Sequence, residues 1–367
     1  MILIETDRDA LLKPLQAVSG IVERRHTLPI LSNVLLERKG GKLRFVATDL
    51  EIQIATETEC SGKGDDAAVT VSARKLQEIL RALPEKTKVV LEQKDNRMLV
   101  KAGKSHFSLQ TLPAEDFPRQ SITTGQQNEK LPQKQLKRLF GLVQYAMAQQ
   151  DVRYYLNGLL LVIEGDQIKV IATDGHRLGY ASTTQKQKKA HQEVILPRKA
   201  VLEVSRLLNN TDEEVTIQVS PNQVIFSFSN IDLTTKVIDG KFPDYTRVIP
   251  SNYQKHIQIS RLQLQQALDR IAILANEKYR GVRWVLTDKN LRIVCTNNEQ
   301  EEAQEELDVD YGGESLDIGF NISYLLDVLN NLDCELVDCS FGDANSSALI
   351  TMPGSSEFKY VVMPMRI

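Results

Sequence analysis

Residues 168–180 read Ile-Lys-Val-Ile-Ala-Thr-Asp-Gly-His-Arg-Leu-Gly-Tyr. The β-branched residues predict a strand, which ends at a polar turn over 173–177. Asp174, His176 and Arg177 could be taken for a catalytic group. A similar turn recurs at 45–50 (Phe-Val-Ala-Thr-Asp-Leu) and at 293–298 (Ile-Val-Cys-Thr-Asn-Asn). A catalytic constellation would not be expected to recur in degraded form, so we interpret the turn as a structural corner.

The sequence around each turn repeats as well. An amphipathic helix precedes each turn, and a second helix follows it at a matching distance. Ser72 and Asn321 are good N-cap residues for two of the second helices, and Pro197 suits the first turn of the other. Strands joined by short turns close each copy, which favours antiparallel sheets with helices on one face. We therefore predict an α+β fold built from three copies of one unit.

A chain of 367 residues is long enough for two or three domains. Segments without periodicity at 119–129 and 249–256 predict linkers, so the expected domains are 1–124, 128–250 and 253–367. Composition, with 42% hydrophobic and 25% charged residues, is that of a soluble globular protein. The lack of a long apolar run and of a secretory signal predicts a cytoplasmic protein without a membrane partner.

Neither the cysteines nor the net charge indicates a ligand directly. Cys60, Cys295, Cys334 and Cys339 show no metal-ligand spacing, so no cofactor or zinc site is expected. Cys334 and Cys339 are either a redox pair or two ordinary thiols. The net charge of −3 argues against nucleic acid. However, five of the six predicted helices are net positive, which is expected if helices face a polyanion through sequence-independent phosphate contacts.

Several blocks resemble the bacterial sliding clamp, the β subunit of DNA polymerase III. They are Thr27–Leu31 (TLPIL), Gln150–Gly158 (QDVRYYLNG), Ala172–Leu178 (ATDGHRL) and Tyr360–Ile367 (YVVMPMRI). The resemblance covers the whole chain. It implies three copies of the DNA-clamp fold in a head-to-tail homodimeric ring, with helices lining the hole. It implies no catalytic residue and no cofactor. The implied partners are duplex DNA, the polymerase III catalytic subunit, the clamp loader, and replication and repair proteins that carry clamp-binding peptides.

The resemblance also implies a pocket for partner peptides that are apolar with a glutamine near the start. It would use Leu156, Thr173, Gly175, His176, Arg177, Leu178, Pro243, Arg247, Val248, Ser347, Val361, Val362, Met363, Pro364, Met365 and Arg366. An apolar C-terminal tail with two methionines fits an adaptable binding surface. The alternatives are that the methionines are ordinary core and that His176 is a hydrogen-bonded structural residue.

Two further sets follow from the resemblance. The residues that would face DNA are Arg24, Arg25, Arg74, Gln150, Arg153, Tyr154, Tyr155, Arg198 and Lys199. The dimer interface would join Arg97, Lys101, Lys104, His106, Phe107 and Leu109 to Ile273, Leu274, Glu299, Glu301, Glu302, Glu305 and Glu306. Arg24 departs from the family pattern in the DNA-facing loop, where a glycine-like residue is expected before the arginine. Lys104, His106 and Gln304 depart from it at the interface, which predicts weaker interface electrostatics here. The tyrosine pair could also be core, and the acidic run a solvated face.

Two other functions compete with a clamp. A hydrolase or phosphoryl-transfer enzyme would use Asp174, His176 and Arg177. The chain shows no nucleophile elbow and no phosphate-binding glycine loop, which counts against that reading. An oligomeric scaffold that never meets DNA is the other alternative. It would lack salt-sensitive retention on circular DNA.

Overall fold

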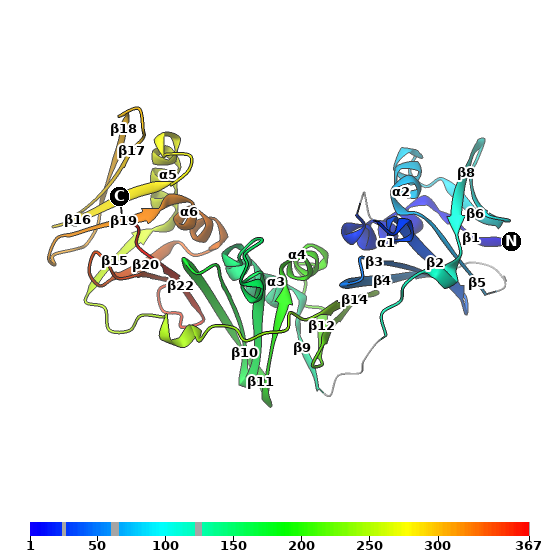
Figure 1. Cartoon of the computed structure of the whole chain (residues 1–367), viewed down its shortest axis with the longest axis horizontal. Helices are drawn as coiled ribbons and strands as arrows, with labels where there is room; N and C mark the ends of the chain where they lie inside the picture. Colours follow the sequence, from blue (N-terminus) through cyan, green and yellow to red (C-terminus); the bar gives the residue numbers. More distant parts are fainter. Residues whose placement is uncertain (24–26, 60–65, 122–126, 367) are drawn as a thin grey trace. The chain divides into compact units, whose positions relative to one another are not determined.

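The computed structural model describes residues 1–23, 27–59, 66–121 and 127–366. The same order of elements occurs three times along the chain (Figure 1). The first copy contains β1 Ile2–Asp7, α1 Arg8–Val18, β2 Asn33–Lys39, β3 Lys42–Thr48, β4 Ile52–Glu59, β5 Ala67–Ser72, α2 Ala73–Ala82, β6 Lys88–Lys94, β7 Arg97–Ala102 and β8 Ser105–Leu112.

The second and third copies follow the same plan. The second contains β9 Gln127–Pro132, α3 Gln133–Val143, β10 Gly158–Thr173, β11 Arg177–Pro197, α4 Arg198–Leu207, β12 Glu214–Val219, β13 Gln223–Phe228 and β14 Ile231–Lys236. The third contains β15 Lys255–Ser260, α5 Arg261–Ile271, β16 Gly281–Thr287, β17 Asn290–Thr296, β18 Glu302–Asp308, β19 Leu316–Asn321, α6 Ile322–Asn331, β20 Leu336–Phe341, β21 Ala348–Thr351 and β22 Phe358–Val362. In the second copy β10 and β11 each run through what are two strands elsewhere.

Contacts divide the chain into two compact units, residues 1–137 with 202–237 and residues 138–201 with 238–367. The first unit holds a 12-stranded sheet in the order β1-β6-β7-β8-β5-β2-β3-β4-β14-β13-β12-β9. The second holds a six-stranded sheet, β10-β11-β22-β21-β20-β15, and a four-stranded sheet, β18-β17-β16-β19. Every described strand pair of these sheets is antiparallel, as predicted.

The predicted helical stripes form the core of each copy. In the first copy Leu11, Leu15 and Val18 of α1 are fully buried, and in the third copy Leu264 and Leu268 of α5 are. The helix starts at Ser72 and Asn321 are confirmed, because each side chain accepts a backbone N–H of the first turn. The start at Pro197 is one residue early, since Pro197 ends β11 and α4 begins at Arg198.

Two predicted boundaries were wrong. The sequence pattern predicts the second helix of the first copy over 73–88, but α2 ends at Ala82, with Leu83 extended immediately before Pro84. The expected linker 119–129 is also too long, because Gln127–Glu129 begin β9 and pair with β12. Polar residues in an edge strand carry no apolar alternation, so the sequence gives no signal for β9.

Candidate partner-binding and DNA-binding surfaces

The turn after β10 is fixed by hydrogen bonds within it. Thr173 Oγ1 donates to the Arg177 carbonyl at 2.6 Å. Asp174 Oδ1 accepts the backbone N–H groups of His176 and Arg177 at 2.9 and 3.1 Å. Gly175 has φ +91°, a conformation that side chains disfavour. Both Thr173 and Asp174 therefore shape the backbone.

The turn after β3 has the same bonds. Thr48 Oγ1 donates to the Ile52 carbonyl at 2.9 Å, and Asp49 Oδ1 accepts from Glu51 and Ile52 at 3.0 and 2.7 Å. In the third copy Asn297 replaces the aspartate and accepts from Glu299 and Glu301. This confirms that the repeated stretch is a structural corner.

Each of the first two turns leads into a strand that pairs with the last strand of the next copy. We call β4–β14 the first junction and β11–β22 the second junction (Figure 1). At the first, Ile52 is opposite Thr235, and Lys236 N–H donates to the Glu51 carbonyl at 2.9 Å. At the second, Arg177 is opposite Val362, and Met363 N–H donates to the His176 carbonyl at 2.9 Å.

Most of the predicted partner set lies at the second junction. Leu156, Leu178, Val361 and Val362 are buried and form its floor, while Met363 is 49% exposed. The other members of the predicted set are exposed or half-buried, namely Gly175, His176, Pro243, Arg247, Val248, Ser347, Pro364, Met365 and Arg366. Met363 is therefore not core, and the exposed side chain of His176 is available to a ligand. We call these residues the partner surface.

The side chain of Arg177 is only 10% exposed and is held by several neighbours. Its Nε donates to Asp174 Oδ2 at 3.1 Å, and its Nη1 contacts Asp327 of α6 at 2.5 Å. Nη2 donates to the Tyr145 carbonyl at 2.6 Å, and the guanidinium lies 4.4 Å from the Tyr324 ring centroid. Arg177 thus joins the turn of the second copy to a helix of the third.

Tyr145, Tyr324 and Asp327 carry no sequence signal that links them to Arg177. Tyr145 lies near Arg177 and Tyr360, with 5.8 Å between the two tyrosine ring centroids. Burial raises the pKa of Tyr360. Nothing in the sequence pairs Asp327 with Arg177 across 150 residues, so only the tertiary structure could identify this cluster.

The residues expected to face DNA are less uniform than predicted. Arg74 is exposed but paired with Glu78 at 2.7 Å. Arg198 donates to the Met147 carbonyl at 3.1 Å, which ties its guanidinium to the loop after α3. Tyr154 is exposed, whereas Tyr155 packs against the core beneath Leu178. Gln150 is exposed and Lys199 half-buried, and Arg24 and Arg25 lie outside the described residues.

Arg153 is one of the residues expected to face DNA, and it also contacts the turn of the second junction. Its Nε and Nη2 donate to the Asp151 carboxylate at 3.0 and 2.9 Å, and Nη2 also donates to the Asp174 carbonyl at 3.3 Å. The hydrogen bonds of the Arg153 side chain and backbone lower the pKa of Asp151 to about 2. The 150–155 loop is therefore attached to the turn of the second junction.

The predicted interface residues lie on two strand edges. Among the described residues, 105–110 of β8 pair only with β7, and β18 pairs only with β17. Arg97, Lys104, Glu299, Glu301 and Glu302 are exposed, and Phe107 and Leu109 half-buried. Ile273 is 79% exposed beside a half-buried Leu274. Glu305 is already paired with Arg270 at 2.6 Å, so the acidic edge is less negative than its sequence implies.

Comparison with known proteins covers all three copies. Models of the N-terminal, central and C-terminal domains of the DNA polymerase III beta subunit match residues 2–121, 130–244 and 246–366. The beta sliding clamp of Pseudomonas aeruginosa is 46% identical over 361 residues, which is 98% of each chain. That of Escherichia coli K12 is 45% identical over 98% of this chain and 99% of its own.

The chain belongs to the DNA polymerase III beta subunit family. Solved clamps share the fold: a P. aeruginosa beta subunit has a TM-score of 0.97 and 45% identity over 100% of both chains. A P. aeruginosa clamp bound to griselimycin has a TM-score of 0.96 at 45% identity, also over 100% of both chains. Like its relatives, this clamp is an accessory processivity subunit and not an enzyme.

The enzyme interpretation is therefore wrong. Asp174 is occupied by the turn and by Arg177. No group of three or more His, Cys, Asp or Glu residues that could hold a metal occurs in the described part of this clamp. Cys295, Cys334 and Cys339 are free thiols, and burial raises the pKa of Cys339 to about 12. No helix among the described residues is long and apolar enough to cross a membrane.

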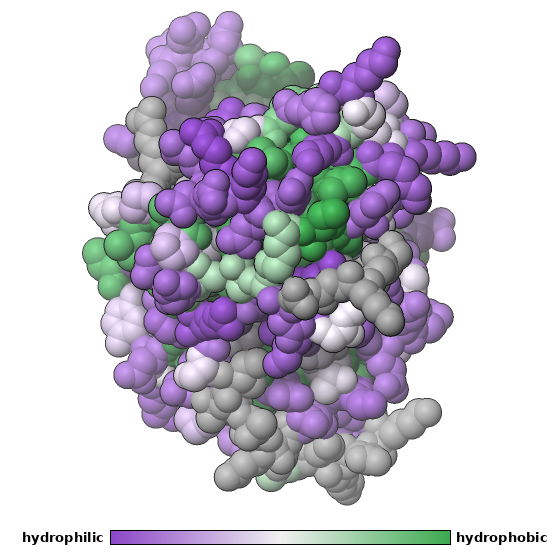
Figure 2. All heavy atoms as spheres, turned by 90° about the vertical axis from the view of Figure 1, so that its right-hand side faces the viewer, coloured by the Kyte–Doolittle hydropathy of each residue, from purple (hydrophilic) through white to green (hydrophobic). Residues whose placement is uncertain are grey.

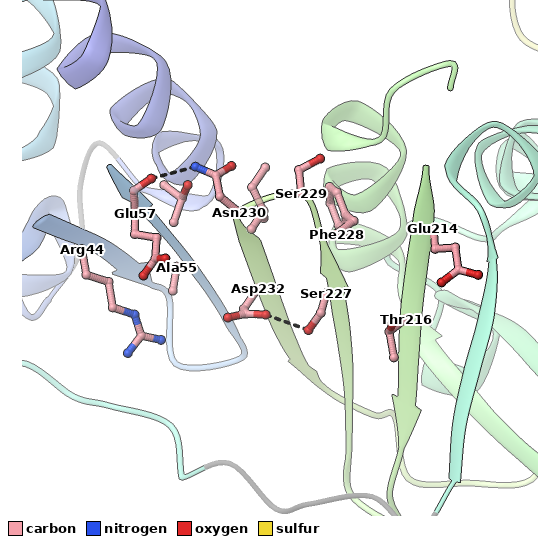
Figure 3. A pocket seen from close by; sticks show the side chains of 12 residues that line it. Arg44, Ala55, Glu57, Glu214, Thr216, Ser227, Phe228, Ser229, Asn230 and Asp232 are labelled. Carbon is pink, nitrogen blue, oxygen red and sulfur yellow. Dashed lines mark hydrogen bonds between the residues drawn. The ribbon is translucent and has the colours of Figure 1, made fainter. Parts of the chain in front are cut away.

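A polar hollow of about 410 Å³ crosses the first junction on one face of the 12-stranded sheet (Figure 3). Its acidic residues have partners nearby. Asp232 accepts from Ser227 at 2.7 Å, and Glu57 contacts Lys42. Asn230 donates to the Glu57 carbonyl at 2.7 Å, which ties the two strands together. We assign no ligand to this hollow, whose polar groups stabilise the junction.

Proposed function

We propose that this sliding clamp acts as a head-to-tail homodimeric ring that encircles duplex DNA without reading its sequence. Topology would retain the ring, so weak phosphate contacts suffice and sliding stays possible. In support, five of the six described helices, α1 to α5, carry net positive charge, and α6 is the exception.

The observation that carries the proposal is a pair of strand edges, 105–110 of β8 and the outer edge of β18, which pair with no further strand in the described part of the chain. The first two junctions join the turn strand of one copy to the last strand of the next (Figure 3 shows the first). The turn strand of the third copy is β18 and the last strand of the first is β8. We infer that β18 of one protomer pairs with β8 of the other, which closes a heterologous contact into a ring.

The two junctions also define a register for the third. The β7–β8 and β13–β14 hairpins both have two-residue turns. When the two turns are aligned, Leu109 corresponds to Thr235. The turn strands align Glu302 with Gln53, because each is opposite the last threonine of the preceding strand. Leu109 of one protomer is then opposite Glu301 of the other, Ser108 opposite Glu302 and His106 opposite Gln304. The side of the molecule at which β8 is labelled in Figure 1 shows hydrophilic residues around apolar patches (Figure 2).

In this register the neutral Gln304 is opposite His106, so the two departures from the family pattern coincide. A histidine beside a glutamine needs no charge partner. We propose that Arg97, opposite Gln110 in its own hairpin, faces Glu299, Glu301 and Glu302, that Lys104 faces Glu306 at the other end of β18, and that Phe107 and Leu109 pack against Ile273 and Leu274. Glu305 would contribute through its pair with Arg270.

We propose that the partner surface binds a short apolar peptide with a glutamine near its start, carried by the polymerase catalytic subunit, the clamp loader and repair proteins. In support, Leu178 and Val361 belong to one buried cluster, and Met363 and Val248 are exposed apolar residues, as an adaptable apolar site requires. DNA contacts are proposed for Arg74, Arg153, Tyr154 and Lys199. Gln150, Tyr155 and Arg198 would position that surface.

Retention on DNA of two topologies tests the ring. After loading by the matching loader, the clamp should stay on nicked circles and leave once they are cut linear. Equal loss from both forms, at a rate set by salt alone, would mean that it is a basic surface binder without ring closure.

A further inference from the structure

A cavity of about 490 Å³ opens at the first junction, where no ligand has been assigned. Residues of the β3–β4 turn, the chain after Phe117 and the start and end of the β13–β14 hairpin surround it. The lining residues are Thr48, Leu50, Pro118, Arg119, Gln120, Ser121, Asn222, Gln223 and Lys236.

The internal repeat matches this cavity to the partner surface, position by position. Thr48 and Leu50 correspond to Thr173 and Gly175, since both turns have the same hydrogen bonds and Leu50 also has a positive φ of 78°. Lys236 corresponds to Met363, because each donates its N–H to the residue before the paired strand.

The other walls correspond as well. Phe117-Pro118 matches Phe242-Pro243, so Pro118 occupies the place of Pro243. Val224 is opposite Thr235, and Ala348 is opposite Val362. Val224 therefore corresponds to Ala348, and the residue before it, Gln223, corresponds to Ser347. The cavity is thus the counterpart, in the first unit, of the surface proposed to bind partner peptides in the second.

The chemistry of the two sites differs. Leu178, Val361 and Val362 correspond to Gln53, Thr234 and Thr235, which are 6%, 2% and 0% exposed. The apolar floor is therefore replaced by buried amide and hydroxyl groups. Gln53 accepts the Gln120 N–H at 3.0 Å and Thr235 Oγ1 donates to the Lys236 carbonyl at 2.9 Å, so these positions present hydrogen-bonded polar groups where the second junction presents an apolar surface.

The charge of the lining differs in the same direction. Lys236 stands where Met363 lies, and Arg119 where Asp244 lies. None of the described lining residues is acidic. Lys236 and Arg119 contact Glu51 and Glu37 outside the cavity, at 3.2 and 2.8 Å. Each cation retains donors beyond one carboxylate contact, and both are more than half exposed.

We propose that the first junction is a second peptide-binding cleft, which takes an extended peptide bearing carboxylate side chains. The proposal rests on the peptide role of the second junction. Lys236 and Arg119 would bind the carboxylates, and the exposed amide of Asn222 would bind the peptide backbone. The Nε2 groups of Gln120 and Gln223 donate to the Leu50 and Ser121 carbonyls at 3.2 Å and hold the wall of the cleft. One protomer would then hold two different peptides, one apolar and one acidic.

Fluorescence anisotropy of the full-length clamp tests this, with a labelled ten-residue peptide of alternating aspartate and serine as the probe. Binding should saturate. Lys236→Met should weaken it at least about fivefold, because a charge-assisted contact is lost. Lys88→Met is the matched control, since Lys88 is also an exposed lysine with one carboxylate contact, at 3.2 Å to Asp7. It should change the affinity less than about twofold.

Three results would overturn the second cleft: no saturable binding, equal weakening by the two lysine variants, or displacement of the probe by excess duplex DNA. The apolar glutamine-led peptide is titrated in parallel. Its binding to the wild type tests the second junction alone, and Lys236→Met should leave it unchanged. A failure of the proposed partner surface is thereby distinguished from a failure of the second cleft.

Discussion

Arg177 connects the turn of the second copy to helix α6 of the third copy. The corresponding positions of the other turns are Ile52 and Glu301. The ion pairs of Arg177 with Asp174 and Asp327 are therefore specific to the second junction. A guanidinium that is 10% exposed and has five polar or aromatic neighbours cannot easily be replaced by lysine, which lacks the planar fork.

We expect Arg177→Met to lower the free energy of unfolding of the second unit by about 1–3 kcal/mol, because it removes a nearly buried guanidinium that pairs with Asp174 and with the partly exposed Asp327. Arg177→Lys should recover only part of this loss. Urea unfolding gives the measurement. The control is Arg247→Met, since Arg247 is 85% exposed and its pair with Asp244 should contribute little. Equal effects of the two methionine substitutions would show that the ion pairs of Arg177 do not stabilise the second unit.

Asp151 supplies a pH prediction. Its pKa is about 2 in the folded chain, against an ordinary value of 3.8, because of the Arg153 hydrogen bonds. The lowered pKa means that the Asp151–Arg153 pair stabilises the fold above pH 3.8 and is lost as the pH falls towards 2. Carbon-13 NMR of the carboxyl group should show a midpoint below 3, which Arg153→Gln should raise. A wild-type midpoint near 4 would show that the pair does not persist in solution.

At the scale of elements, the junctions are the informative feature. Two of them are present within one chain, and the third follows from their register. Strand pairing specifies register closely, because a one-residue slip turns every side chain to the other face.

Cysteines at Ser108 and Glu302 should therefore form a disulfide between protomers on mild oxidation, and a non-reducing gel would show the covalent dimer. The control pairs Ser108→Cys with Gln304→Cys, which is two residues out of register and should cross-link far more slowly. A reversed preference would mean that the third junction does not copy the other two.

The segment after β22 is the element that completes the partner surface. It is held by Met363 N–H to the His176 carbonyl and by Met365 N–H to the Gly319 carbonyl, both at 2.9 Å. Removal of residues 363–367 should abolish binding of the apolar peptide and leave the dimer intact, because β22 ends at Val362. Anisotropy and sedimentation measure the two effects. Unchanged peptide affinity after truncation would refute the assignment of this surface.

For the whole molecule, retention on DNA should depend more on ring closure than on the positive charge of the helices. Ile273→Ala with Leu274→Ala removes apolar contact at the proposed interface and should give monomers by sedimentation. The variant should lose retention on circular DNA while its helices keep their positive charge. A control, Leu262→Ala, removes a leucine of α5 that is 51% exposed outside the proposed interface and should change neither result. A dimeric double variant would show that the contact lies elsewhere.

The sequence by itself determined the repeat, the antiparallel α+β class and the positions of most helices. Apolar periodicity and turn residues report on local structure, and three copies report it three times. The corner at 173–177, the N-caps Ser72 and Asn321 and the positive helices could all be predicted in this way.

Only the tertiary structure decided which of those residues meet. The link from Arg177 to Asp327, the internal pairing of Glu305 and the cavity beside Lys236 depend on strands that lie far apart in the chain. Periodicity carries no information about such distant partners. The edge strand β9, short and polar, was missed for a related reason, because its pairing with β12 and not its composition makes it a strand.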